Sequence, residues 1–117
     1  MASLPRTVYH MNATVAASGT NSTAIPCDGW PIASVQAPAA FTGTQIKFQV
    51  TNRVDSDGDP TAWADAQDSG GVDIGAITIA ASDTLPVHQE VLNAKFFRIV
   101  CATAQTYKSV FEVKLES

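Results

Sequence analysis

The residues best suited to bind an ion lie in one short segment, Asp55-Ser-Asp57-Gly-Asp59. Carboxylates at alternate positions supply the hard oxygen ligands that Ca²⁺ prefers, and Ca²⁺ takes six to eight of them. The segment lacks the full calcium loop, its glycine falls too early for that loop, and Pro60 follows at once. Asp, Gly and Pro in such a run are also typical of a turn. We expect a hairpin loop here, with a calcium site at Asp55, Asp57 and Asp59 as the alternative.

The remaining residues show no spacing that is typical of catalysis. Neither His10 nor His88 belongs to a zinc-binding pattern such as His-Glu-x-x-His. Cys27 and Cys101 are far apart in the sequence and form no Cys-x-x-Cys motif. The chain also lacks a Gly-x-Ser-x-Gly nucleophile motif and a phosphate-binding glycine loop. We therefore predict no catalytic residue, no cofactor and no enzyme activity. We expect both cysteines to be buried thiols, with a disulfide between them as the alternative under oxidising conditions.

Large side chains and one arginine are the candidates for a binding surface. Trp30 and Trp63 each combine a large apolar area with one hydrogen-bond donor, so they suit either a core or an interface. Tyr9 and Met11 are the large residues of an N-terminal segment that is otherwise small and polar. Arg98 lies in the middle of an apolar stretch, where we expect its side chain to point outward and to pair with acidic residues.

The charge pattern argues against a nucleic-acid partner. The chain of 117 residues has a net charge of −4, whereas a nucleic-acid binder needs a basic surface to displace counterions. Between Arg53 and Lys95 the only Asp, Glu, Lys or Arg residues are acidic ones. This acidic block is either a solvated face or a surface that attracts a basic partner or a cation.

The apolar residues are too dispersed for a membrane protein. No apolar run approaches the roughly 18 residues that span a bilayer as a helix. The N-terminus lacks the basic and apolar regions of a signal peptide. We therefore expect no membrane partner.

Alternation of apolar and polar residues predicts three strong strands, at residues 44–53, 95–103 and 109–116. We expect the last two of these strands to form a hairpin around Ala104-Gln-Thr. The residues predicted to point inward are Ile46, Phe48, Val50, Phe97, Ile99, Cys101, Phe111, Val113 and Leu115.

Shorter segments complete the predicted architecture. We expect further strands at 30–36, 62–66, 72–74 and 76–80, and a single helical turn within 85–93. Many short strands separated by turn signals indicate an all-β domain, an antiparallel β-sandwich or jelly-roll-like single domain with little or no helix. We assign residues 25–117 to this domain.

The first 24 residues are rich in Thr, Ala, Ser and Asn, so they are predicted to be an N-terminal arm or an edge strand. As an arm, residues 1–24 would become ordered on a neighbouring molecule, and residues 25–117 would fold alone.

The segment from Gly29 to Val50 resembles small structural proteins encoded in tailed-bacteriophage genomes. The likeness is carried by Gln36-Ala-Pro-Ala-Ala-Phe41-Thr and by the Phe48-Gln49 strand that follows. The Asp57-Gly58 turn, Phe96-Phe-Arg98 and the closing strand Phe111 to Leu115 continue the same order, so that the likeness covers residues 25–116. It implies a virion component without catalytic residues, above all a head decoration (cement) protein.

The resemblance also implies partners and a location. A decoration protein binds the major capsid protein and neighbouring copies of itself, here as a homo-oligomer, dimer or trimer. It is made in the host cytoplasm and ends on the capsid surface. The interface candidates are Tyr9, Met11, Trp30, Trp63 and Arg98.

Two alternatives remain open at this stage. One is a tail, fibre or baseplate module of the virion. The other is a carbohydrate-binding β-sandwich module, in which Trp30 or Trp63 would stack on a sugar and the Asp-rich loop would hold Ca²⁺.

Overall fold

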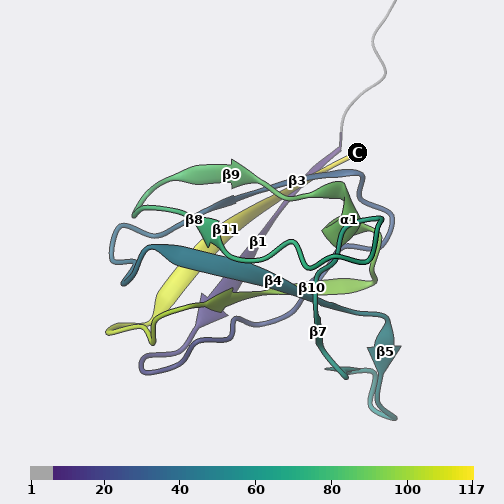
Figure 1. Cartoon of the computed structure of the whole chain (residues 1–117), viewed down its shortest axis with the longest axis horizontal. Coiled ribbons are helices and arrows are strands. Elements are labelled where there is room, and N and C mark those ends of the chain that lie inside the picture. Colours follow the sequence, from purple (N-terminus) through teal and green to yellow (C-terminus); the bar gives the residue numbers. More distant parts are fainter. Residues whose placement is uncertain (1–6) are drawn as a thin grey trace, which may run out of the picture.

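The structure is a computed structural model that describes residues 7–117, in which two larger antiparallel sheets are accompanied by a two-stranded hairpin and one short helix (Figure 1). The strands of the four-stranded sheet, in spatial order, are β1 (Val8–Val15), β11 (Ser109–Glu116), β3 (Ile32–Gln36) and β9 (Thr84–Pro86). Those of the five-stranded sheet are β2 (Ile25–Pro26), β10 (Phe96–Cys101), β4 (Gln45–Thr51) and β7 (Ala64–Asp65), with β8 (Ile77–Thr78) also paired to β4. The remaining elements are the hairpin of β5 (Arg53–Val54) and β6 (Pro60–Thr61) and the helix α1 (Gln89–Leu92).

The strand order is that of a jelly roll. β7 and β8 pair with different ends of β4. When the small strands β5, β6 and β7 are set aside, the two sheets read β1-β11-β3-β9 and β2-β10-β4-β8. The prediction of an all-β sandwich with little helix is confirmed, because α1 is only four residues long. Within residues 7–117, no helix is long and apolar enough to cross a membrane.

Alternate side chains of both sheets build the core. The predicted inward residues of β4, β10 and β11 are buried, except that Val50 is only half-buried. Two edge-to-face aromatic pairs lie within this core. The ring centroids of Phe48 and Phe97 are 5.7 Å apart, and those of Phe41 and Phe111 are 5.6 Å apart.

The predicted hairpin between the last two strands is wrong. β10 pairs with β2 and β4 in one sheet, whereas β11 pairs with β1 and β3 in the other. Residues 102–108 therefore carry the chain from one sheet to the other. Alternation along a strand identifies its inward face but not its partner, so closeness in sequence was a poor guide to pairing.

A buried glutamine holds this crossing in place. Gln105 is 1% exposed, and its side-chain oxygen accepts hydrogen bonds from the backbone N–H of Thr42 and the hydroxyl of Ser109. Its side-chain nitrogen donates to the carbonyl oxygens of Thr42 and Thr103. Because both ends of the carboxamide are satisfied, this polar side chain is accommodated in the interior and links three segments of chain.

Residues 8–15 form an edge strand, one of the two alternatives for the N-terminal segment. β1 pairs with β11 from Val8↔Glu116 to Val15↔Ser109, and Ala13 and Val15 are completely buried. An arm separate from the domain does not describe these residues. The small apolar content misled the prediction, because an edge strand buries one face only and small side chains suffice there. Residues 1–6 of the predicted segment lie outside the described residues.

Several short elements also differ from expectation. The strand expected at 30–36 begins at Ile32, and residues 72–74 contribute only an isolated bridge, Gln67↔Asp73. β2 and β9 were not predicted, because strands of two or three residues are too short to show a periodicity. The helical turn predicted within 85–93 is confirmed as α1.

The core assignment predicts a large loss of stability when either central phenylalanine is truncated. Phe48→Ala and Phe111→Ala should each lower the free energy of unfolding by about 3–5 kcal/mol in urea denaturation, because each removes a buried ring and leaves a cavity. The control is Glu112→Ala, because Glu112 lies on the exposed face of β11. This substitution should change the free energy of unfolding by less than about 0.5 kcal/mol. A loss below about 1 kcal/mol for either phenylalanine would contradict the assigned inward faces.

The pairing of β1 makes a second prediction. A protein that lacks residues 1–24 should lose its cooperative thermal transition or melt far below the full-length protein, because the deletion exposes β11 and removes Ala13 and Val15 from the core. Differential scanning calorimetry of both proteins measures this. A truncated protein with an unchanged melting temperature would instead restore the original hypothesis that residues 25–117 fold alone.

Candidate interaction surface

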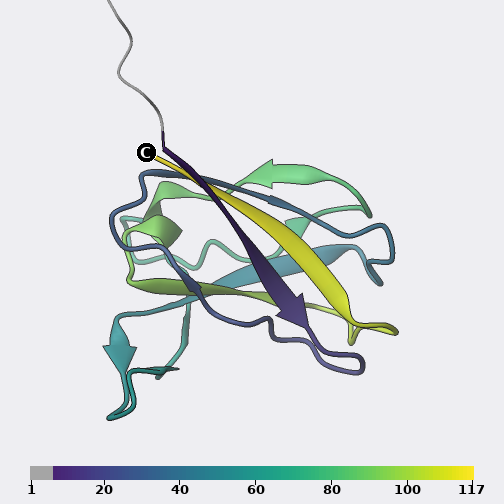
Figure 2. The same ribbon diagram turned by 180° about the vertical axis from the view of Figure 1, so that it is seen from behind.

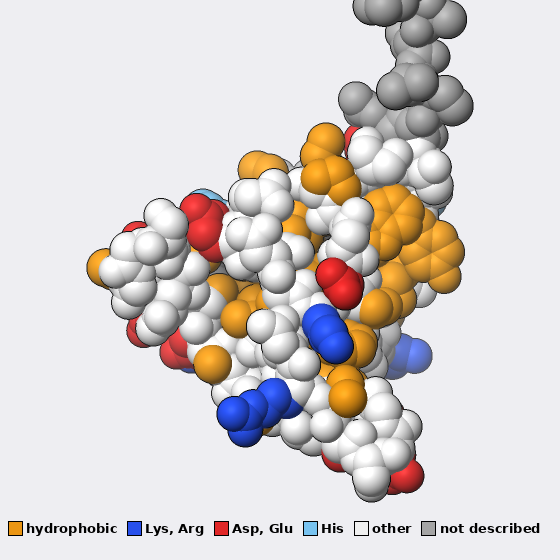
Figure 3. Space-filling model, turned by 90° about the vertical axis from the view of Figure 1, so that its right-hand side faces the viewer, with side chains coloured by type: hydrophobic (Ala, Val, Ile, Leu, Met, Phe, Trp, Pro, Cys, Tyr) orange, Lys and Arg blue, Asp and Glu red, His pale blue; other side chains and the backbone are white. Residues whose placement is uncertain are grey.

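An apolar corner lies at the start of β1. Tyr9 shares the inward face of the strand with Met11, yet the Tyr9 side chain is 54% exposed and Met11 only half-buried. The ring of Tyr9 stacks on that of the half-buried Trp30, with centroids 6.4 Å apart and an interplanar angle of 19°. Hydrophobic side chains gather on the face of the molecule shown in Figure 3. Tyr9, Met11 and Trp30 therefore form one surface, here called the aromatic corner.

Two exposed aliphatic residues lie close to this corner on the outer face of the four-stranded sheet. Val8 is 44% exposed and Ile32 is 47% exposed. They belong to the strands on either side of β11, and both pair with the same residue, Glu116. The carboxylate of Glu116 lies 2.7 Å from the ammonium of Lys114. Val8 and Ile32 thus add exposed apolar surface on either side of this ion pair, and exposed apolar patches are typical of sites that contact another macromolecule.

The other two interface candidates form a separate site on the five-stranded sheet. The guanidinium carbon of Arg98 lies 4.6 Å from the ring centroid of Trp63, a cation–π contact. Arg98 donates two hydrogen bonds to Oε1 of Gln49, at 2.9 and 2.6 Å. Trp63 and Arg98 therefore support each other, and they lie on a different sheet from the aromatic corner.

Arg98 reaches the acidic block only through an intermediate. Nε2 of Gln49 donates to Oδ1 of Asp65 at 3.0 Å, and Nζ of Lys47 lies 3.0 Å from the same oxygen. The hydrogen bond from Gln49, followed by the interaction with Lys47, holds the pKa of Asp65 below its usual value. The expectation that Arg98 would pair directly with an acidic residue is therefore wrong. Instead, contacts run from Trp63 through Arg98, Gln49 and Asp65 to Lys47.

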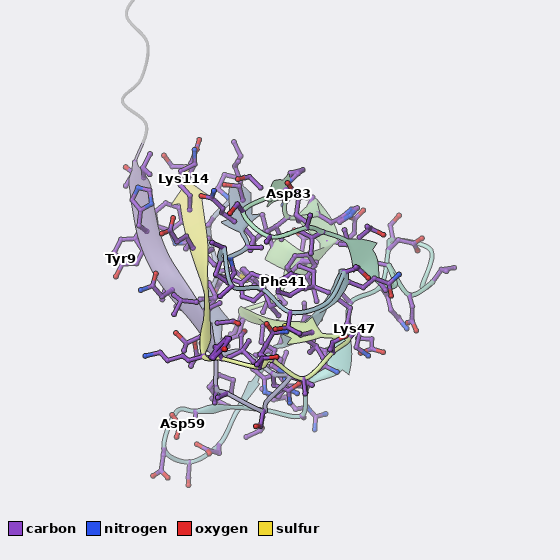
Figure 4. The ribbon with its side chains drawn as sticks, turned by 90° about the vertical axis from the view of Figure 1, so that its left-hand side faces the viewer. Tyr9, Phe41, Lys47, Asp59, Asp83 and Lys114 are labelled. Carbon is purple, nitrogen blue, oxygen red and sulfur yellow. The ribbon has the colours of Figure 1, made fainter. Side chains whose placement is uncertain are left out.

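The Asp-rich segment forms the hairpin loop between β5 and β6, as expected. Oδ1 of Asp55 accepts the backbone N–H groups of Asp57 and Asp59, at 2.9 and 3.0 Å. Gly58 adopts a φ of 85°, a conformation that suits glycine. These contacts account for Asp55 and Gly58 in the loop without an ion. Figure 4 shows Asp59 in a loop that projects away from the body of the domain.

The three carboxylates of this loop are nevertheless close to one another. Ligand oxygens from Asp55, Asp57 and Asp59 all lie within 4.8 Å, and all three residues are exposed. They would supply three of the six to eight oxygens that Ca²⁺ takes. The calcium alternative therefore stays open as a prediction.

An acidic cleft of about 510 Å³ lies between the loop before β8 and helix α1. It was not predicted, because its residues come from segments that are far apart in the sequence and only the fold brings them together. The acidic block is thus spread over this cleft, the Asp-rich loop and two further turns, in which Asp68 and Asp83 accept backbone hydrogen bonds. The polar residues that line the cleft are Asn52, Asp65, Gln67, Asp73, Glu90 and Asn93.

The cysteines are buried free thiols, as expected. Burial raises the pKa of Cys27 to about 12 and that of Cys101 to about 11. Sγ of Cys27 donates to the carbonyl oxygen of Ala94 at 3.2 Å, so this thiol has a structural partner. Both histidines are exposed: His10 lies on β1, and His88 directly precedes α1.

The geometry of the Asp-rich loop predicts that folding does not depend on calcium. EDTA should leave the melting temperature unchanged, because hydrogen bonds within the loop already hold its shape. The double variant Asp57→Asn with Asp59→Asn is a matched control, since it removes two carboxylates and keeps Asp55 as the acceptor. A drop with EDTA that Ca²⁺ alone reverses in the original protein, and that is absent in the variant, would establish the calcium site.

Comparison with known proteins finds no family model, no curated protein and no solved structure that matches the chain.

Proposed function

We propose that this chain is a structural protein of a tailed-bacteriophage virion, above all a capsid decoration or cement protein that binds across major capsid protein subunits. The observation that carries the proposal is the aromatic corner. Tyr9 and Trp30 present stacked rings beside Met11, and aromatic residues and Met are enriched in protein interfaces. Residues 25–116 resemble phage structural proteins, and this resemblance is the reason for proposing a virion protein as the partner.

The proposed mechanism is binding to a protein partner and not catalysis. A domain that binds assembled capsid subunits better than separated ones stabilises the shell by mass action. A capsid presents many equivalent sites, so that modest affinity at each site is sufficient when copies are linked. The partners are the major capsid protein and neighbouring copies of this chain, with no nucleic acid, membrane or cofactor. The protein would be made in the host cytoplasm and would end on the capsid surface.

The jelly-roll strand order is compatible with this proposal but does not select it. Jelly rolls occur in viral capsid proteins and also in lectins. A shared fold leaves function undetermined, because function depends on the site. The aromatic corner would equally serve a tail, fibre or baseplate module, which is the alternative within the virion.

Carbohydrate binding is the second candidate function, and the acidic cleft is the observation that favours it. Its carboxylates and amides could accept and donate hydrogen bonds to sugar hydroxyl groups. Trp63, next in sequence to the cleft residue Ala64, is the candidate for a stacking platform. However, the guanidinium of Arg98 covers one face of the Trp63 ring. The cleft therefore supports sugar binding less well than the aromatic corner supports protein binding.

The proposal is tested by co-expression with the major capsid protein encoded in the same genome. Particles are purified by sedimentation, and the bound copies and the particle melting temperature are measured. We expect the chain to sediment with the particles and to raise their melting temperature. Sedimentation with tails instead of heads would favour the alternative within the virion. Binding to a glycan array without binding to particles would favour carbohydrate recognition.

The same assay predicts which residues bind. Tyr9→Ala and Trp30→Ala should each weaken particle binding by about tenfold or more, because truncated aromatic anchors typically cost at least about 1.4 kcal/mol. Tyr107→Ala is the matched control, since Tyr107 is 66% exposed and lies in the crossing at the opposite end of the sheet. Equal binding by all three variants would contradict the assignment of the corner.

A further inference from the structure

Within residues 7–117, one sheet edge lacks the usual protection of edge strands. Exposed edges tend to pair with other chains, and proteins protect them with short strands, charges or prolines. β9 contains Pro86, β2 contains Pro26, and β7 has only two residues and includes Asp65. β8 is also only two residues long. β1, by contrast, is eight residues long and contains no Asp, Glu, Lys, Arg or Pro.

Backbone groups on the outer flank of β1 are available for pairing. In an antiparallel ladder, alternate residues direct their N–H and C=O groups toward the partner strand, and the others direct them away. The backbone N–H of Ser117 donates to the carbonyl of Thr7, so the odd-numbered residues of β1 direct their backbone N–H and C=O groups toward β11. The backbone groups of Val8, His10 and Asn12 therefore point outward, away from β11.

The far end of this flank is already occupied. The backbone of Thr14 exchanges hydrogen bonds with Thr23, and the hydroxyl of Thr23 also donates to the carbonyl of Asn12 at 3.4 Å. Among residues 7–117, no comparable partner lies on the outer side of Val8 or His10. The open stretch thus runs from Val8 to Asn12. Figure 4 shows Tyr9 within this stretch, at the periphery of the molecule, with its side chain pointing away from the body of the domain.

We propose that two copies of this chain pair through the open stretch of β1, antiparallel and about a two-fold axis at His10. In this register Val8 pairs with Asn12 of the second copy, and His10 pairs with its own equivalent. Each such pair would exchange two backbone hydrogen bonds. The register uses the outward N–H groups of all three residues. The carbonyl of Asn12, which already accepts the hydroxyl of Thr23, would accept the second copy through its other lone pair, and the loop at Thr23 ends the pairing beyond Asn12. The four-stranded sheets of the two copies would become continuous.

The side chains on the inner face support a second copy as the occupant. The register places Tyr9 of each copy opposite Met11 of the other, as a directly facing cross-strand pair. A thioether next to an aromatic ring is a favourable contact, and both side chains are incompletely buried in the single chain. The edge is therefore complementary to itself, as a two-fold interface requires. A five-residue stretch is short, so we expect a weak dimer with a dissociation constant of about 1 μM or more.

The dimer specifies the self-association that the proposed function includes, but its test does not involve capsids. Analytical ultracentrifugation of the full chain at increasing concentration should show a monomer–dimer equilibrium. Over the same range, NMR should show that the amides of Val8, His10 and Asn12 gain protection from hydrogen exchange. A monomer at all concentrations up to about 1 mM, or rapid exchange of these three amides in a dimer, would overturn the proposal.

A pair of variants at one position isolates the backbone contact. His10→Pro removes an outward N–H, which β11 does not use, and should weaken the dimer at least tenfold. His10→Ala keeps the N–H and should dimerise like the original protein. Equal dimerisation of both variants would overturn the proposal, and if His10→Pro does not fold, the exchange measurement decides. Capsid binding by monomeric His10→Pro would show that the dimer and the proposed function are separable.

Discussion

The two sheets of this jelly roll are joined closely at one end and lie apart at the other, and its surface features follow from that geometry (Figure 2). At the closed end, Ser22 bridges the sheets. It forms a β-bridge with Val15 of β1 and exchanges hydrogen bonds with the backbone of Ile99 in β10. Gln105 secures the same end by holding the crossing between β10 and β11. Twisted sheets that meet at one end leave a gap at the other, which other side chains must fill.

Different elements fill the open end. Helix α1 contributes Val91 and Leu92 to the core, and Cys27 donates to the carbonyl of Ala94 just beyond the helix. Trp30 and Tyr9 cover the flank next to β1. Trp30 packs against the core, and Tyr9 stacks on the Trp30 ring and meets solvent, so that the pair is anchored to the domain and remains available to a partner. An aromatic ring with a polar group suits such a position between core and solvent.

The sequence predicted the fold class and the inward faces, but not the pairing of strands. Regular alternation in 44–53, 95–103 and 109–116 is a local property, and burial of one sheet face requires it. Partners are a property of the whole topology, so the β10–β11 connection was mistaken for a hairpin. The buried role of Gln105 in the crossing was not predicted either, because a polar residue in a short connection is usually an exposed turn residue.

The candidate surface was predicted in its residues and not in its arrangement. Tyr9, Met11, Trp30, Trp63 and Arg98 were all selected for size or position, yet they form two separate sites. Tyr9 and Trp30 meet because β1 and the turn before β3 lie at the same open end. The cation–π pair of Trp63 and Arg98 depends on the adjacency of β4 to β7 and β10. No sequence spacing encodes either contact, since each joins segments from distant parts of the chain.

We propose that the open end, with its aromatic corner, is the surface that binds the capsid. Hydroxyl-radical footprinting read by mass spectrometry tests this without any substitution, because Tyr, Met and Trp side chains oxidise readily when they are exposed. The account predicts that Tyr9, Met11 and Trp30 are oxidised in the free protein and protected on capsids, whereas Tyr107 reacts equally in both states. Unchanged oxidation of the corner on capsids, together with new protection at Trp63, would contradict it.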